Sequence, residues 1–267
     1  MPDPSPGPDA VKYYDDNAWV GLDLVSSWRL TGDATYLRRA QAVMRYAESG
    51  GDDAGGGLWW SEARTYRNTA ANAATAELAA QLYLAMHDRT DLAWAERIYG
   101  WERERLVLPD GRVEDGVAGG STQPRDTHWT YNYGSVVAAG VARYQATGRT
   151  GYLTDAESVA TYALHHLRRP DGALPPRASF DGVLADGLLK LWRVDGRTNL
   201  AAALTRNADL AWSRAQSDVG LFGDSFGGPP PADPVALLTD GGGGPGPGGG
   251  GSHRDRHVAL SRDPPSP

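Results

Sequence analysis

The sequence predicts an all-α protein in which helical hairpins repeat along the chain. Similar turns at 30–37, 87–94 and 146–153, with a weaker fourth copy at 194–200, each end one apolar-periodic stretch and begin the next. Equivalent positions in these turns lie 57, 59 and 48 residues apart. A helical hairpin repeated at this period is typical of an α/α array. The predicted architecture is therefore a helical toroid, of which about four hairpins are present.

Eight helices follow from the apolar periodicity and the turn residues. The first helix of each pair carries small and aromatic residues on every side, which predicts burial on more than one face. The second helix of each pair has a charged face and a single apolar stripe, so the pairs alternate inner and outer helices. The predicted ranges are 16–31, 35–48, 69–87, 91–106, 132–147, 151–168, 181–194 and 198–214.

Two connections are longer than a simple turn needs, 50–68 and 109–131, and both are rich in Gly, Trp and polar residues. Loops of this kind concentrate binding residues. We expect a Pro-rich disordered leader at 1–10, a toroid domain at 11–230 and a disordered Pro/Gly-rich tail at 231–267. With eight helices in place of the twelve that close a ring, the exposed inner faces favour self-association.

Composition narrows the class of partner. A net charge of −7 argues against nucleic acid and anionic membranes, which both bind basic surfaces. There is no Cys, no apolar run long enough to span a membrane and no signal-peptide pattern in the chain. Nine Trp and twelve Tyr against three Phe favour aromatics with a polar atom, which suit both carbohydrate clefts and ordinary helix packing.

Asp15 and Asp16 are adjacent at the start of the first helix, between aromatic residues on both sides. Neighbouring carboxylates repel unless one takes up a proton, which is the electrostatic setting of carboxylate-pair catalysis. The alternative is helix capping, because Asp in the first turn accepts free backbone N–H groups and complements the helix dipole. The flanking aromatics favour a cleft that stacks sugar rings.

Four separated motifs, in this order and spacing, resemble glycoside hydrolase family 76. They are Tyr-Asp-Asp-Asn-Ala-Trp at 14–19, Gly-Gly-Gly-Leu-Trp-Trp-Ser at 55–61, Tyr-Arg-Asn-Thr-Ala-Ala-Asn at 66–72 and Trp-Thr-Tyr-Asn-Tyr-Gly at 129–134. Gly-Leu-Phe-Gly at 220–223 extends the resemblance, which covers roughly residues 11 to 230. Any one motif alone is weak, and their combination is specific.

The resemblance implies an (α/α)6 barrel that hydrolyses α-1,6-linked mannan internally with retention of configuration. It implies Asp15 as nucleophile and Asp16 as acid/base, and a secreted or extracytoplasmic location. Retaining hydrolysis needs two carboxyl groups about 5 to 5.5 Å apart, an order of separation that consecutive residues at a helix start can reach. No metal or other cofactor is expected, and His128, His165 and His166 are expected at the surface or in loops, since they lack zinc-ligand spacing.

The remaining candidates are polar or aromatic residues of the motifs that could bind sugar. Trp59 and Trp60 could equally attach a loop to the barrel, and Asn68 could cap the third helix. Asn72 is expected to point into the pocket, because Asn is unfavourable inside a helix unless its amide has a partner. Asp186, inside the seventh helix, is expected to be structural. The predicted substrate-binding residues are Trp19, Trp59, Trp60, Asn68, Asn72, Trp129, Tyr131, Asn132 and Tyr133.

The chain departs from the family pattern at both ends. The aspartate pair begins at residue 15, where the family has preceding helices, and the run of Gly and Pro after residue 240 stands where a last inner helix is expected. The sequence is therefore interpreted as truncated at the N-terminus and altered at the C-terminus. An inactive fragment or mannan-binding remnant stays an alternative. A sugar epimerase of the same architecture is less favoured, because the inner helices offer no His pair.

Overall fold

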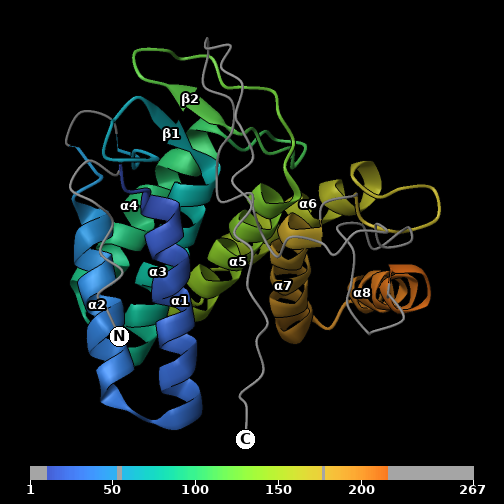
Figure 1. Ribbon diagram of the computed structural model, residues 1–267, viewed down its shortest axis with the longest axis horizontal. Helices are drawn as coiled ribbons and strands as arrows, with labels where there is room; N and C mark the ends of the chain where they lie inside the picture. The colour runs from blue at the N-terminus through green and yellow to red at the C-terminus, as the bar shows by residue number, and fades with distance from the viewer. Residues whose placement is uncertain (1–10, 53–55, 176–177, 216–267) are drawn as a thin grey trace, which may run out of the picture. The chain divides into compact units, whose positions relative to one another are not determined.

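The computed structural model describes residues 11–52, 56–175 and 178–215, drawn in colour in Figure 1. All of them belong to one compact unit, residues 1–235. The predicted leader at 1–10, the predicted tail at 231–267 and the motif at 220–223 lie outside the described residues.

The described chain forms four consecutive helical hairpins (Figure 1). The predicted helices agree with the observed ones within three residues, except that the last prediction also spans a short π-helical segment, Ala211–Ala215. The pairs are α1 (Tyr14–Thr31) with α2 (Ala34–Glu48), α3 (Thr69–Met86) with α4 (Arg89–Arg105), α5 (Thr130–Thr147) with α6 (Thr150–His166), and α7 (Ala178–Asp195) with α8 (Thr198–Leu210).

The hairpin turns use local chemistry that the sequence makes visible. Gly32 and Gly148 end α1 and α5 in the left-handed conformation, with φ of 73° and 70°. His87 takes the same conformation after α3, with φ of 59°. Asp33 and Asp88 then cap the following helices, each accepting a backbone N–H two residues later at 2.8 Å.

Helices α1, α3, α5 and α7 form an inner row in which consecutive members contact one another. Each also packs against the second helix of its own hairpin. Fourteen of the eighteen residues of α3 are buried, whereas α2 buries only Ala40, Met44 and Ala47. The alternation of inner and outer helices is therefore confirmed, and the arrangement is part of an all-α toroid. Burial on more than one face is confirmed for α3 and α5 but is wrong for α1, which lies at the end of the row and buries only the single stripe Tyr14, Ala18, Gly21 and Val25.

Two short strands join the long connections at one end of the helices (Figure 1). Strand β1 (Tyr66–Asn68) pairs antiparallel with β2 (Gly116–Ala118). The sequence predicted only loops here, because three residues are too few for an alternating pattern to be recognised. Gly116 is required at the pairing, since a Cβ there would lie 2.3 Å from the carbonyl oxygen of Arg67.

Helices α5 and α7 approach each other at backbone contact. A Cβ on Gly134 would lie 2.3 Å from the carbonyl oxygen of Val183, and a Cβ on Gly187 would lie 2.4 Å from the carbonyl oxygen of Gly134. Both distances are well below any ordinary Cβ contact. The spacing of these two inner helices therefore depends on the absence of side chains at this crossing.

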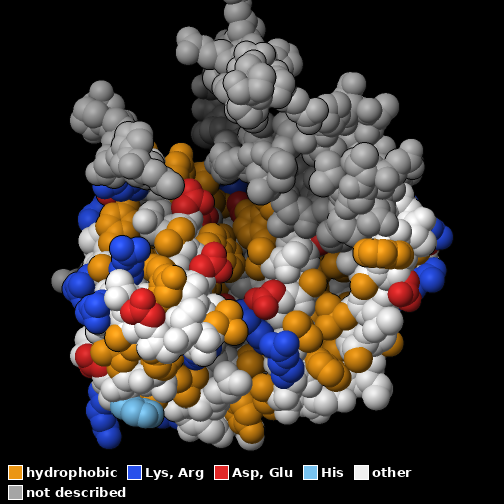
Figure 2. All heavy atoms as spheres, turned by 60° about the horizontal axis from the view of Figure 1, so that its bottom comes forward, with side chains coloured by type: hydrophobic (Ala, Val, Ile, Leu, Met, Phe, Trp, Pro, Cys, Tyr) orange, Lys and Arg blue, Asp and Glu red, His pale blue; other side chains and the backbone are white. Residues whose placement is uncertain are grey.

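Among the described helices, α1 and α7 lie at the two ends of the inner row. They carry exposed apolar side chains, Val20 and Leu30 on α1 and Trp192 on α7. Figure 2 shows hydrophobic side chains interspersed with charged ones on one face of the molecule. The self-association of such faces stays a prediction.

Candidate active site

The aspartate pair lies in the first turn of α1. Tyr13 is the N-cap residue, and no side chain caps this helix. The Asp15 Oδ1 atom accepts a hydrogen bond from the neighbouring Asp16 backbone N–H at 3.1 Å. Neither aspartate is the N-cap residue itself, but Asp15 accepts a free backbone N–H of the first turn and both residues complement the helix dipole, so the pair also has the first-turn role that the alternative describes.

Asp15 is held by donors from two other parts of the chain. The indole Nε1–H of Trp60 donates to Asp15 Oδ2 at 2.9 Å. The Asn68 side chain also lies close enough to the Asp15 carboxylate to lower its pKa. Asn68 caps α3 through its side-chain oxygen, which accepts from the Ala71 backbone N–H at 3.1 Å. Its amide NH₂ is therefore the group that can donate to Asp15.

Burial and the charge of Asp16 raise the pKa of Asp15 to about 6, against the opposing effect of the hydrogen bonds from Trp60, the Asp16 backbone and Asn68. Asp16 lies at the surface, and partial desolvation of its carboxyl group raises its pKa. Asp15 therefore changes protonation in a pH range where an ordinary aspartate is fully ionised.

We expect Asp15→Asn to stabilise the fold above pH 6. The folded protein binds the Asp15 proton up to about pH 6 and the unfolded chain only up to 3.8, so wild-type stability falls as pH rises through this window and stays lower above it. Allowing for partial exposure, the gain in the free energy of unfolding at pH 7 is about 2 kcal/mol. Urea unfolding at pH 7 and pH 4 checks this, because the difference should shrink to a small remainder at pH 4, close to the unfolded pKa of 3.8. An equal difference at both values would contradict the assigned cause.

The loop that carries Trp60 is tied to α1 and to β1. The Tyr14 backbone N–H donates to the Trp60 carbonyl at 2.8 Å, and the Trp60 N–H donates to the Tyr66 carbonyl at 2.7 Å. The Tyr13 ring lies 4.8 Å from the Trp60 ring, centroid to centroid. Trp60 is thus held beside the pair and is half-buried, as a sugar-binding residue would be.

Asp115, which precedes β2, forms a second polar cluster near the pair. Its carboxylate accepts hydrogen bonds from Tyr66 Oη at 2.8 Å and from Asn132 Nδ2 at 3.2 Å. Burial and the nearby negative charges of Asp115 and Asp15 raise the pKa of the Tyr131 hydroxyl. The sequence did not predict Tyr66 and Asp115 as site residues, although Tyr66 begins the motif at 66–72, because their contact depends on the pairing of β1 with β2.

Three aromatic side chains meet where α5 and α7 begin. The rings of Trp129 and Tyr131 are stacked with centroids 6.2 Å apart, and Phe180 lies 4.9 Å from Tyr131 and 5.8 Å from Trp129. All three are half-buried, so each keeps surface open to a ligand. The sequence predicted Trp129 and Tyr131 but not Phe180, because Phe180 is adjacent to them only through the packing of α7 on α5.

Two of the predicted binding residues, Trp59 and Tyr133, pack against other side chains of the protein. Trp59 donates to Asp52 Oδ2 at 3.1 Å, and the Arg67 guanidinium lies 3.5 Å from the Trp59 ring centroid, which favours the loop-attachment alternative. Tyr133 is fully buried and stacked on Tyr162.

Asn72 and Asn132 are also fully buried. The Asn72 amide uses all of its polar atoms in internal hydrogen bonds, which points to a structural role, whereas the buried Oδ1 of Asn132 has no partner among the described residues. Substrate contact by Asn132 and Tyr133 stays a prediction. Trp19 is half-buried on α1, one helical turn after Asp15, where it keeps partial exposure on the side of the pair.

The predicted histidines have separate roles. His165 and His166 are exposed in the last turn of α6. His128 is half-buried between Asp126, 2.7 Å from its Nε2, and the Tyr133 hydroxyl, 3.1 Å from its Nδ1, and so joins the long loop to α5. No group of three or more His, Cys, Asp or Glu side chains suited to a metal ion occurs among the described residues.

Asp186 forms an ion pair with Lys190, which also binds the buried Glu77 of α3 at 2.7 Å. The expectation that Asp186 is structural agrees with this geometry. The cluster links the inner helices α3 and α7 further along their length, beyond the end that carries the aspartate pair.

The signature of glycosyl hydrolase family 76 matches residues 5–178. The chain belongs to this family. A putative mannan endo-1,6-alpha-mannosidase of Schizosaccharomyces pombe is 30% identical over 162 residues, which are 55% of this chain and 37% of that protein. Mannan endo-1,6-alpha-mannosidase DCW1 of Saccharomyces cerevisiae is 34% identical over 107 residues, 36% of this chain and 24% of that protein. The chain thus spans well under half of the length of these curated family 76 relatives.

The GH76A alpha-1,6-mannanase of Salegentibacter sp. HEL1_6 has a similar structure, with a TM-score of 0.77, 27% identity, and coverage of 82% of this chain and 70% of that one. An inactive variant of that family 76 enzyme, with two consecutive aspartates replaced by asparagine, has been solved with alpha-1,6-mannotriose. In the part of our chain that the structure describes, no helix is both long and apolar enough to cross a membrane.

Proposed function

We propose that this family 76 chain hydrolyses α-1,6-mannosidic linkages within mannan, with retention of configuration. The observation that carries the proposal is the consecutive pair Asp15 and Asp16 on α1, with Asp15 held by Trp60 and aromatic rings gathered at the same end of the inner helices. The inactive double-aspartate variant of the Salegentibacter enzyme supports a catalytic role for such a pair.

In the proposed mechanism, ionised Asp15 attacks the anomeric carbon while the carboxylic acid of Asp16 protonates the departing glycosidic oxygen. The glycosidic bond breaks, and the sugar remains attached to Asp15 as an ester. Asp16, now ionised, removes a proton from water, which attacks the anomeric carbon and releases Asp15. Two inversions give net retention.

The two carboxyl groups titrate as one coupled pair, because each negative charge raises the pKa of the other group. In the free protein Asp15, the more buried of the two, holds its proton up to about pH 6. The assigned roles need the proton on Asp16, so a sugar bound against the exposed Asp16 must favour its neutral form by excluding water. The reverse assignment, with Asp15 as acid, is therefore part of the test.

The test is incubation of the purified chain with linear α-1,6-mannan, followed by separation of the products and NMR of the first-formed anomer. We expect manno-oligosaccharides with the α anomer formed first. A first-formed β anomer would contradict retention. Binding to mannan without any released product would support the alternative of a mannan-binding remnant.

Azide distinguishes the two roles. With an activated mannoside, Asp15→Ala plus azide is expected to give the inverted glycosyl azide, because azide takes the place of the missing nucleophile. Asp16→Ala plus azide is expected to give the retained product, because azide then attacks the intermediate on Asp15. If Asp15→Ala gave the retained azide and Asp16→Ala the inverted azide, Asp15 would be the acid/base and Asp16 the nucleophile.

A further inference from the structure

The Asn72 amide uses every one of its polar atoms inside the protein. Its Oδ1 accepts the Leu58 backbone N–H at 2.7 Å, and its Nδ2 donates to the Leu58 carbonyl at 3.0 Å and to the Asn68 carbonyl at 2.7 Å. The side chain is 0% exposed, so no substrate atom reaches it. One side chain on α3 thus fixes a loop residue and the residue that begins its own helix.

Asn72 holds two residues, Leu58 and Asn68, and both are connected to the surroundings of Asp15. Leu58 lies two residues before Trp60, whose indole donates to Asp15. Asn68 contributes the other side chain that lies close to the Asp15 carboxylate and lowers its pKa. The Leu58 side chain is itself buried in the core, so the loop is fixed at this point by apolar packing and by the Asn72 amide together.

We propose that Asn72 is a positioning residue for catalysis, which holds both side-chain donors to the Asp15 carboxylate, Trp60 and Asn68, from a single buried amide. The proposal rests on the proposed function in that it takes Asp15 as a reacting group. Asn72 acts through other residues and is not itself a catalytic residue.

The expected effect of losing this amide is a shift of the donors rather than their release. Trp60 keeps its two backbone hydrogen bonds to Tyr14 and Tyr66, and Asn68 keeps its place in β1. Small displacements of groups around a reacting carboxylate still reduce the rate strongly, by about a hundredfold for 1 Å. We therefore expect a tenfold to hundredfold loss of kcat with a smaller change of KM in Asn72→Ala.

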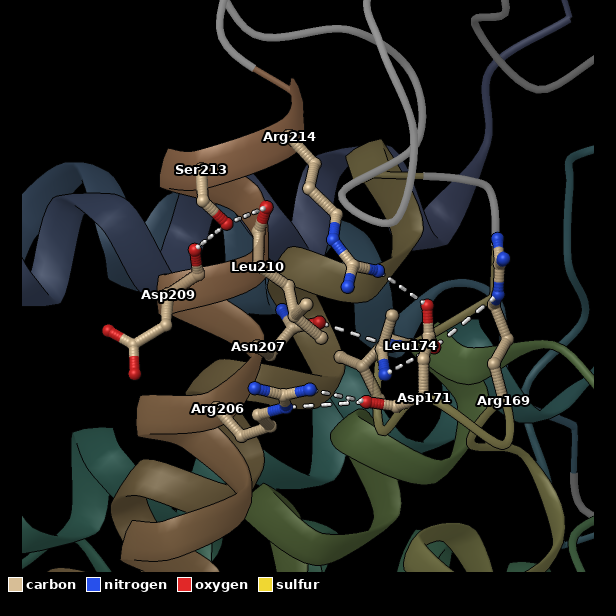
Figure 3. A network of polar contacts seen from close by, with 10 residues as sticks. Arg169, Asp171, Leu174, Arg206, Asn207, Asp209, Leu210, Ser213 and Arg214 are labelled. Carbon is tan, nitrogen blue, oxygen red and sulfur yellow. Dashed lines mark hydrogen bonds and ion pairs between the residues drawn. The ribbon is translucent and has the colours of Figure 1, made fainter.

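The chain offers a matched control in Asn207. This largely buried residue of α8 likewise holds a loop leucine, accepting the Leu174 backbone N–H at 3.1 Å (Figure 3). The same loop is attached through Asp171, whose carbonyl accepts from Arg206 of α8 and whose carboxylate accepts from Arg214 of the π-helical segment that follows α8. Asn207→Ala therefore removes a helix-to-loop anchor of the same kind, with one hydrogen bond in place of three, and among the described residues no hydrogen bond joins it to Asp15.

The experiment measures the pKa of Asp15 directly, by ¹³C NMR titration of the aspartate carboxyl carbons in the whole purified chain. The Asp15 signal is identified by its absence in Asp15→Asn. Since Trp60 and Asn68 lower the pKa of Asp15, we expect it to rise in Asn72→Ala and to stay unchanged in Asn207→Ala. On mannan, the acid limb of the pH–rate profile is expected to move to higher pH in Asn72→Ala only.

Trp60→Phe tests whether Asn72 acts through Trp60, because it removes the indole donor and keeps an aromatic ring. The double variant Asn72→Ala/Trp60→Phe is expected to lose less than the product of the two single losses. If Asn72→Ala does not fold, Asn72→Ser takes its place, measured at a temperature where its circular dichroism matches that of the wild type.

An unchanged Asp15 pKa in a folded Asn72 variant, or equal shifts in the Asn72 and Asn207 variants, would overturn the positioning role and leave the proposed function standing. Conversely, a shifted Asp15 pKa in a chain that releases no product from mannan would show that Asn72 holds the side chains around Asp15 and would reject the proposed function, and with it the role in catalysis.

Discussion

Replacing either aspartate of the pair by asparagine is expected to lower kcat on α-1,6-mannan by about a thousandfold or more. In Asp15→Asn the amide cannot form the glycosyl ester, and in Asp16→Asn the amide can neither protonate the leaving oxygen nor activate water. The two groups act as a unit, so the kcat of the double variant should be only slightly lower than that of the less active single variant. Product release from mannan, at matched protein concentration and with circular dichroism to verify helix content, measures the loss.

Asp23→Asn is the control for this experiment. Asp23 lies on the same helix, two turns beyond Asp16, and is exposed. Its replacement removes one negative charge from α1 without touching the pair, so near wild-type kcat is expected. Wild-type rates in Asp15→Asn or Asp16→Asn would place the catalytic groups elsewhere, and a comparable loss in Asp23→Asn would point to a general effect of charge.

Gly134→Ala is expected to destabilise the protein by about 3 kcal/mol or more. The added methyl group would lie 2.3 Å from the Val183 carbonyl oxygen, which belongs to the α7 backbone and cannot rotate away. Helices α5 and α7 must then separate, and Trp129, Tyr131 and Phe180 at their beginnings must lose part of their ring contacts. Urea unfolding monitored by circular dichroism gives the change in the free energy of unfolding.

Gly182→Ala is the matched control on α7. A Cβ at Gly182 meets no atom within 4 Å, so the substitution adds only helix propensity. It is expected to stabilise the protein by about 0.5 to 1 kcal/mol. A neutral Gly134→Ala would show that the two helices are farther apart in solution than the structure places them.

The helices were predictable because their signals are local. Gly32, Gly148 and the caps Asp33 and Asp88 mark where helices end and begin, and the apolar pattern separates the densely buried α3 from the half-exposed α2. The pairing of β1 with β2 was not predictable, since each strand has only three residues and its partner lies about fifty residues away in the sequence.

The candidate site was predictable where adjacent residues carry the chemistry, as in the Asp15–Asp16 pair. It was not predictable where the contact depends on packing. Nothing local distinguishes Asn72, which is sealed inside the protein and holds Leu58, from Asn68, which reaches Asp15. Asp115 and Phe180 likewise join the site only because β2 pairs with β1 and α7 crosses α5.

By itself, then, the sequence determined the repeated hairpins, their inner and outer helices and the acidic pair, because turn residues, periodicity and adjacency are properties of neighbouring positions. Only the tertiary structure decided which polar side chains face the pair and which form hydrogen bonds within the interior. These contacts join residues that are distant in the sequence, because a buried amide must be hydrogen-bonded to whichever groups the packing places beside it.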